Sequence, residues 1–149
     1  MAHHELTAAP GLVHWAMFDG TLEPVLEVDS GDTVTLHCVT GTPDAIPDPA
    51  EYDVPAELPR IHEEAAQKQS SGHIMTGPVA VKGAQPGDVL EVRIDDVSLR
   101  TDWGYNKIRP LAGLLPEDFP EGRLLLIPID RERKTAKLPW GVDLPLNPF

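Results

Sequence analysis

Proline limits the folds open to this chain more than any other residue, because sixteen prolines and twelve glycines are spread over 149 residues. Inside a helix, proline removes a backbone donor and clashes with the preceding turn, so a helical bundle is excluded. The chain can bury one core, and no stretch approaches the roughly 20 apolar residues of a membrane span. The single cysteine excludes an internal disulfide. We expect one soluble, turn-rich domain, or a piece of a larger one, with no membrane partner.

The charge balance is strongly acidic, with 12 basic and 24 acidic residues and a formal net charge of -12. Such a chain repels phosphate backbones, so we expect no nucleic acid among its partners. The first ten residues, MAHHELTAAP, lack a basic segment followed by an apolar run. No secretory signal is visible in them, and a cytoplasmic location is expected.

A strand, a Gly-Asp turn and a second strand occur twice along the chain. Apolar residues alternate over 22–28 and 34–38 around the first turn, and over 79–81 and 89–94 around the second. A third hairpin is expected over 122–140, with four charged residues at its turn. Repeated hairpins of this kind indicate an all-β, sandwich-like antiparallel fold.

Three residues of these strands and turns could be mistaken for catalytic groups. Asp32 and Asp88 follow glycines in the two turns, where an aspartate accepts backbone N–H bonds, so we interpret both as turn residues. Cys38 is predicted to point inward from its strand and to act as a small apolar side chain.

Residues 41–70 are interpreted as a loop and helix insertion between the first two hairpins. The first half is rich in proline and aspartate, whereas Leu58, Ile61 and Ala65 recur at helical spacing in the second half. One short helix is predicted there, with Asp53 available as its cap. Its sequence IHEEAAQ is not a His-Glu-x-x-His zinc site, because alanine occupies the place of the second histidine.

Few polar residues remain as candidates for chemistry. The sequence has no Gly-x-Ser-x-Gly elbow, no glycine-rich phosphate loop and no cysteine pair for zinc. No motif surrounds four of the six histidines, which are His3, His4, His37 and His62. The remaining candidates are His14 with the nearby Asp19, and His73 in the stretch SGHIMTGP.

Four segments carry a resemblance to a known family, namely VHWAMFDGTLEPVLEVDSGDTVTL, GHIMTGPVAVKGAQPGDVLEVRI, DWGYNKIRPLAGLLPEDF and LPWGVDLPLNPF. In this order they resemble the acetamidase/formamidase family, which hydrolyses short linear amides to a carboxylic acid and ammonia. Family members are longer, and their second half resembles an Asp-Gly-His segment followed by Gly-Asp-Gly-Glu. The resemblance therefore implies that residues 1–149 are the amino-terminal portion of a larger β-sandwich enzyme. Activity would then need a complementary carboxy-terminal half or partner chain.

The resemblance also implies a set of site residues. Amide hydrolysis needs a nucleophile and stabilisation of the oxyanion, and a bound metal supplies both. A divalent metal, with zinc as the candidate, is expected, with His73, His14 and Asp19 as candidate ligands and His73 and Thr76 as candidate catalytic residues. Each assignment has a structural alternative: His73 and His14 could hold the fold together by hydrogen bonds, and Asp19 could simply stabilise a surface turn.

Trp103 and Tyr105, on either side of a glycine, admit two interpretations. They could line a small apolar pocket that binds the acyl group of the substrate, or they could close the end of the hydrophobic core.

Two classes of function follow from the sequence. The first is an amide hydrolase acting on a small amide substrate. The alternative is a non-catalytic β-sandwich subunit for binding or assembly. A homo-oligomer is expected.

Overall fold

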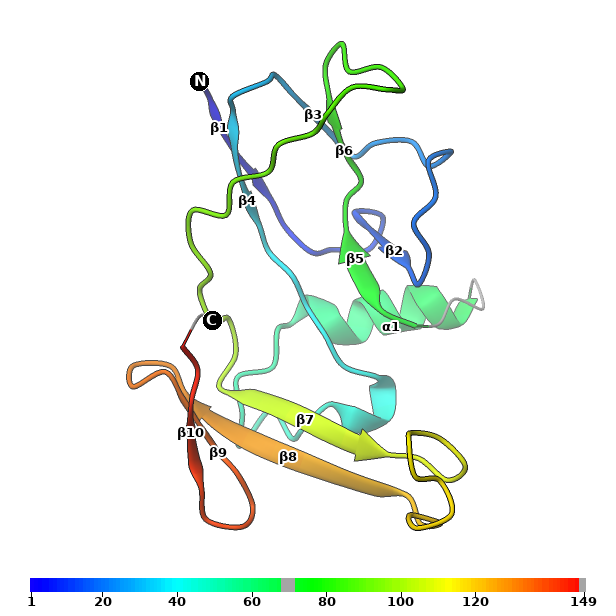
Figure 1. The fold of residues 1–149 in the computed structure, drawn as a ribbon, viewed down its shortest axis with the longest axis vertical. Coiled ribbons are helices and arrows are strands. Elements are labelled where there is room, and N and C mark those ends of the chain that lie inside the picture. Colours follow the sequence, from blue (N-terminus) through cyan, green and yellow to red (C-terminus); the bar gives the residue numbers. More distant parts are fainter. Residues whose placement is uncertain (68–71, 148–149) are drawn as a thin grey trace. The chain divides into compact units, whose positions relative to one another are not determined.

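The structure is a computed structural model, and it describes residues 1–67 and 72–147. The chain forms two compact units (Figure 1). Unit 1 comprises Met1–Pro43 with Pro55–Asp95, and unit 2 comprises Asp44–Val54 with Asp96–Phe149. In the described ranges the strands greatly outnumber the single α-helix, so the predicted all-β fold with one short helix is confirmed. The position of the insertion over 41–70 and the packing of sheets into a sandwich stay predictions.

Unit 1 contains three two-stranded sheets. Two of the strand pairs are parallel and the third is antiparallel, so the predicted antiparallel arrangement is wrong for most of unit 1. The parallel pairs are β1 (His3–Leu6) with β4 (Thr33–Leu36) and β3 (Leu26–Val28) with β6 (Val79–Val81), and the antiparallel pair is β2 (Val13–Trp15) with β5 (Ile74–Thr76).

The first predicted hairpin is wrong in its pairing. Strands β3 and β4 follow one another across the Gly-Asp turn, as expected, but β3 pairs with β6 and β4 pairs with β1. Alternating apolar residues favour a strand wherever one face is buried, whereas the partner is chosen by contacts distant in sequence. The pattern therefore located these strands and could not identify their neighbours.

The two Gly-Asp turns are built in the same way, which confirms their interpretation. In each, the aspartate carboxylate accepts the N–H of the residue three positions earlier, Asp29 to Asp32 at 3.2 Å and Gln85 to Asp88 at 2.8 Å. The aspartate N–H in turn donates to the carbonyl of that same residue, at 3.1 Å and 3.0 Å. Gly31 lies directly before Asp32 with φ of 91°, a conformation that glycine adopts without strain.

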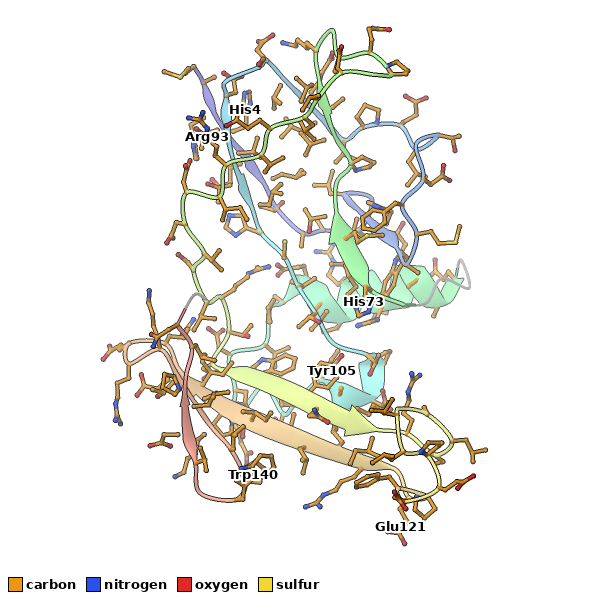
Figure 2. All side chains as sticks on the ribbon, in the orientation of Figure 1. His4, His73, Arg93, Tyr105, Glu121 and Trp140 are labelled. Carbon is orange, nitrogen blue, oxygen red and sulfur yellow. The ribbon has the colours of Figure 1, made fainter. Side chains whose placement is uncertain are left out.

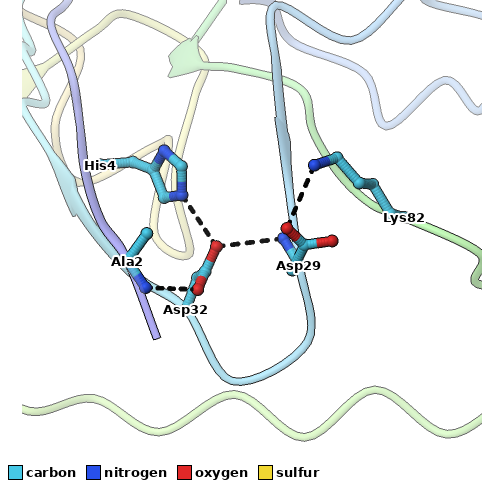
Figure 3. A network of polar contacts seen from close by, with 5 residues as sticks. All are labelled: Ala2, His4, Asp29, Asp32 and Lys82. Atoms are coloured by element: carbon cyan, nitrogen blue, oxygen red, sulfur yellow. Dashed lines mark hydrogen bonds and ion pairs between the residues drawn. The ribbon is translucent and has the colours of Figure 1, made fainter.

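Asp32 also joins the amino terminus to this turn (Figure 3). Its carboxylate accepts the Ala2 N–H at 2.6 Å and lies 2.9 Å from His4 Nε2. The Ala2 bond and then the His4 bond lower the pKa of Asp32 to about 2. Next to it, Lys82 Nζ pairs with Asp29 at 3.1 Å, and this bond raises the pKa of Lys82. Asp32 therefore stays ionised through most of the acid range and connects β1 to the turn before β4.

Two further expectations for unit 1 are wrong. Residues 89–94 form no strand, and their apolar side chains are exposed. Cys38 is exposed instead of pointing inward, because β4 ends at Leu36 and the alternation of the strand does not reach the cysteine.

The predicted helix is confirmed as α1 (Glu57–Gln67). Leu58, Ile61 and Ala65 are its buried residues, as their spacing required. Asp53 does not cap it: the Leu58 N–H donates to the Pro55 carbonyl at 3.0 Å, while Asp53 hydrogen-bonds within unit 2.

Unit 2 contains a four-stranded antiparallel sheet in the order β10-β9-β8-β7. Its strands are β7 (Trp103–Ile108), β8 (Arg123–Asp130), β9 (Thr135–Lys137) and β10 (Asp143–Pro145), and a short 3-10 helix, η1 (Pro43–Ala45), lies at the boundary of the two units in sequence. The predicted hairpin over 122–140 is confirmed as β8 and β9. Its charged turn is held by Asp130, whose carboxylate accepts the N–H groups of Glu132 and Arg133 at 3.0 Å and 2.9 Å.

Candidate functional site

The β2–β5 ladder brings the two candidate histidines together within unit 1. His14 pairs with Met75 and Trp15 with Ile74, and the Ala16 N–H extends the ladder by donating to the His73 carbonyl at 2.9 Å. His73 thus lies opposite Ala16, two residues further along the ladder than the partner of His14. In antiparallel sheets such diagonal positions share a face. The register predicts that His14 and His73 belong to one side of this ribbon.

The two histidines differ in what they contact. His14 is half-buried, and its Nδ1 lies 3.3 Å from the Gly77 carbonyl oxygen. The Gly77 N–H donates to the Leu12 carbonyl at 3.0 Å. This bond and the His14 contact together hold the end of β5 to β2. His73, labelled in Figure 2, is exposed, and its ring makes no hydrogen bond or ion pair with residues 1–67 and 72–147. The structural alternative thus describes His14 well, whereas the ring of His73 has no structural partner in the described chain.

Asp19 stabilises its own turn. Its carboxylate accepts both the N–H and the hydroxyl of Thr21, at 2.8 Å and 2.7 Å. These two bonds lower the pKa of Asp19, with the side-chain bond as the larger cause and the charge of His14 as a minor one. The carboxylate is exposed and ionised, so its geometry is that of a turn residue.

Thr76 ends β5, and its hydroxyl donates to the His37 carbonyl at 2.9 Å. The hydroxyl therefore links β5 to the segment after β4. A catalytic role would require Thr76 to exchange this bond for one to the substrate.

Two features near these strands were not found from the sequence. The ring of His62 on α1 lies 5.5 Å from that of Trp15, measured between centroids, and its buried Nε2 has no hydrogen-bond partner in the described chain. Along β1 and β4, His4 pairs with Asp32 and His37 with Glu5, at 2.9 Å and 2.6 Å. Only the fold brings these partners together, so no local motif could have indicated them.

Gly72 permits the close approach of the two segments. A Cβ at this position would lie 2.5 Å from the Ala16 Cβ, and Gly72 has φ of 106°. The backbone before His73 therefore passes directly against Ala16. Only glycine fits there without a shift.

We expect Gly72→Ala to lower the free energy of unfolding by about 2–4 kcal/mol, from the positive φ and the contact with Ala16 together. Gly87→Ala is the matched control, because Gly87 has φ of 103° and nothing within 4 Å of its Cβ position. The control should lose only the conformational part, about 1–2 kcal/mol. Chemical denaturation measures both losses, and equal losses would contradict the packing described for Gly72.

A match to a family profile shows to which family this chain belongs. The profile described as the Acetamidase/Formamidase family matches residues 12–143, which include β2, β5 and both candidate histidines. This chain belongs to the acetamidase/formamidase family. The resemblance noted from the four sequence segments is thereby confirmed.

Two curated proteins are similar to this chain in sequence. The protein named "Putative formamidase C869.04" from Schizosaccharomyces pombe (strain 972 / ATCC 24843) is 36% identical over 101 residues, covering 63% of this chain and 22% of that protein. The protein named "Formamidase" from Methylophilus methylotrophus is 41% identical over 54 residues, covering 33% of this chain and 13% of that protein. The matches thus span less than a quarter of the length of either relative. No solved structure matches the chain.

The described residues do not form a complete site for the metal expected from the family resemblance. No group of three or more His, Cys, Asp or Glu side chains in residues 1–67 and 72–147 is arranged to hold a metal ion. His14 and His73 share the β2–β5 ribbon, and the Asp19 carboxylate is engaged by Thr21. A catalytic zinc needs about three protein ligands. The described part of this family member therefore does not fit a metal on its own.

The predicted substrate-binding aromatics lie in unit 2. Trp103 is 3% exposed, and its Nε1 donates to the Asp53 carbonyl at 3.1 Å. Tyr105 is half-buried on the same strand, β7, with its ring centroid 6.5 Å from that of Trp103. Trp103 is thus part of the core of unit 2, and Tyr105 is the more accessible of the two rings. Their role toward the substrate stays a prediction.

The helices give no indication of a membrane span. The 11-residue α1 is too short to cross a bilayer, and no other helix in the described ranges has the length and apolarity to do so.

Proposed function

We propose that this chain is the amino-terminal portion of an amide hydrolase that cleaves the C–N bond of short linear amides to carboxylate and ammonia. The observation that carries the proposal is the family match over residues 12–143, which includes the β2–β5 ribbon with its candidate histidines. Relatives named as formamidases in a yeast and a bacterium support the substrate class. Because these relatives are much longer than the matched regions, we propose that activity needs a complementary part of the family polypeptide.

His73 is the residue in this chain to which we assign chemistry. The reaction must deliver a proton to the leaving amine and position the carbonyl of the amide. An exposed imidazole whose ring has no hydrogen-bond or ion-pair partner among residues 1–67 and 72–147 is available for both tasks. Gly72 lets the backbone before His73 pack against Ala16. His14, held by Gly77, would keep the ribbon that carries His73 in place. Thr76 and Tyr105 are assigned supporting roles at the substrate.

Three further proposals concern the metal, the cellular location and the oligomeric state of the enzyme. A divalent metal, with zinc as the candidate, would need ligands beyond those of the described residues, and we derive no step through it. A cytoplasmic location and a homo-oligomeric enzyme stay predictions.

A non-catalytic subunit for binding or assembly is the second candidate function. It is favoured by the exposed apolar side chains of residues 89–97, which suit an interface. The two functions differ in whether His73 matters for ammonia release.

A chimera tests the proposed function. In it, residues 12–143 of this chain replace the corresponding region of the Methylophilus methylotrophus formamidase. We expect the chimera to release ammonia from formamide and acetamide, because the family match predicts that the region is interchangeable. A chimera that folds, as judged by circular dichroism and a cooperative melt, yet releases no ammonia would favour the non-catalytic subunit.

A further inference from the structure

Residues 89–94, with the sequence VLEVRI, are an apolar segment that no described part of the chain covers. Val89, Leu90, Val92 and Ile94 are 95%, 71%, 72% and 79% exposed. The segment belongs to unit 1, follows the second Gly-Asp turn and pairs with no strand in the described ranges (Figure 1). Exposed apolar residues in such a run indicate an interaction surface.

The side chains of this segment already separate onto two sides. Arg93 Nε and Glu91 Oε1 form an ion pair at 2.7 Å, and both side chains are largely exposed. A contact between residues two positions apart is typical of an extended chain, whose side chains alternate with period two. Leu90, Val92 and Ile94 then share the opposite side. Figure 2 labels Arg93 on this segment.

Nothing in the segment opposes pairing with another strand. Natural edge strands are protected by lysine, proline or a bulge, and VLEVRI contains neither lysine nor proline. Four of its six residues are valine, leucine or isoleucine, and both valine and isoleucine favour strands. The acidic residues that flank the segment, Asp88 and Asp95, lie at its two ends, so they limit the length of a ladder without blocking its centre.

The segment is complementary to itself in one antiparallel register. With Val92 opposite Val92 of a second copy, Leu90 faces Ile94, and Glu91 faces Arg93 twice, once on each side of the two-fold axis. A shift by one residue places apolar side chains opposite charged ones. A shift by two residues either way places Glu91 opposite Glu91 or Arg93 opposite Arg93. Of these antiparallel registers, only the one centred on Val92 places both Glu91 and Arg93 opposite a residue of the opposite charge.

We propose that residues 89–94 join two copies of this chain as a two-stranded antiparallel sheet about a two-fold axis at Val92. The partner is a second copy because, across such an axis, Glu91 and Arg93 of each copy both meet the opposite charge on the other copy. Backbone hydrogen bonds of the new ladder, the apolar Leu90–Ile94 contacts and the exchanged Glu91–Arg93 pairs hold it. The proposal does not depend on the amidase function, since it concerns a surface away from the β2–β5 ribbon in sequence.

Charge reversal at the two central positions tests the proposal with the full chain. Glu91→Arg places arginine opposite Arg93 of the second copy, and Arg93→Glu places glutamate opposite Glu91. Each change should weaken the dimer about tenfold or more, measured as its dissociation constant by sedimentation velocity. The double variant E91R/R93E restores opposite charges and should dimerise like the wild type. An equimolar mixture of the two single variants should form heterodimers, because both cross-strand pairs are then attractive.

Two matched substitutions on exposed residues of unit 2 serve as controls. Glu121→Arg and Arg123→Glu change the net charge by the same amounts and should leave the dissociation constant near its wild-type value. A wild-type chain that is monomeric at every concentration would contradict the proposal. Residues 89–94 would then be expected to pair with another part of the family polypeptide. Dimers that survive both single reversals, or single variants whose mixture does not associate, would contradict it equally.

Discussion

Replacement of His73 by alanine is expected to lower amide turnover by the chimera about a hundredfold or more, while the melting temperature changes little. Loss of a group that transfers a proton or orients the substrate costs rates of this size. Stability should hold because the ring of His73 is exposed and makes no hydrogen bond or ion pair with the described residues. The measurement is paired: ammonia release and thermal unfolding of the same preparations.

His37 provides the matched control for this substitution, because it lies within residues 12–143. It is a half-buried histidine of unit 1 whose Nε2 lies 2.6 Å from Glu5 Oε1, and since Glu5 is not part of the chimera, His37→Ala should leave turnover unchanged. His73→Asn separates shape from proton transfer, since asparagine retains hydrogen-bonding capacity and cannot carry the proton. If His73→Ala lowers the melting temperature by many degrees and the remaining folded protein turns over normally, His73 is structural and the site assignment is wrong.

Trp103→Ala is expected to destabilise unit 2 by about 3–5 kcal/mol, the usual cost of removing a buried tryptophan side chain. Trp103 is 3% exposed, and its indole N–H satisfies the Asp53 carbonyl, so the substitution removes both packing and a hydrogen bond. Chemical denaturation of the full chain measures the loss.

Two further substitutions, Trp103→Phe and Tyr105→Ala, serve as comparisons for Trp103→Ala. Trp103→Phe keeps an aromatic ring and should lose less, chiefly the bond to Asp53 at about 1 kcal/mol and some packing. Tyr105→Ala should destabilise less than Trp103→Ala, because Tyr105 is only half-buried. An unchanged stability of Trp103→Ala, together with a raised KM of the chimera, would instead make Trp103 a wall of the substrate pocket.

Local features of this fold could be predicted from the sequence because their causes are local. The Gly-Asp turns depend on a carboxylate that reaches a backbone N–H three residues away, and both turns have this geometry. Helix α1 depends on apolar residues at helical spacing, and Leu58 and Ile61 are fully buried. The β8–β9 hairpin depends on a short charged turn between two strands.

Features that depend on distant contacts could not be predicted. The parallel pairs of β1 with β4 and of β3 with β6 join residues about 30 and 50 positions apart, and alternation says nothing about such partners. Residues 89–94 have the alternation of a strand but no neighbour in the described chain to pair with. The same pattern therefore gave a strand at β6 and none here.

The candidate site likewise combines features that could be predicted from the sequence with features that could not. The sequence selected His14 and His73 by their motifs, and the structure places His14 in β2 and His73 directly before β5, its partner strand. The sequence already offered the turn role of Asp19 as an alternative, and the bonds from Thr21 agree with it. It could not show that Thr76 bonds the His37 carbonyl, since that contact spans 39 residues. Nor could it show that the ring of His62 lies 5.5 Å from that of Trp15, or that its buried Nε2 has no hydrogen-bond partner in the described residues.

The central proposal is that this chain contributes to the active site of an amide hydrolase together with another part of the family polypeptide. Steady-state ammonia release from formamide tests it most directly, compared among the isolated chain, the Methylophilus methylotrophus formamidase without its corresponding region, and the chimera that combines them. We predict release by the chimera alone, and loss of that release in its His73→Ala variant. Steady release by the isolated chain, or a folded chimera as inactive as its two parts, would contradict the claim.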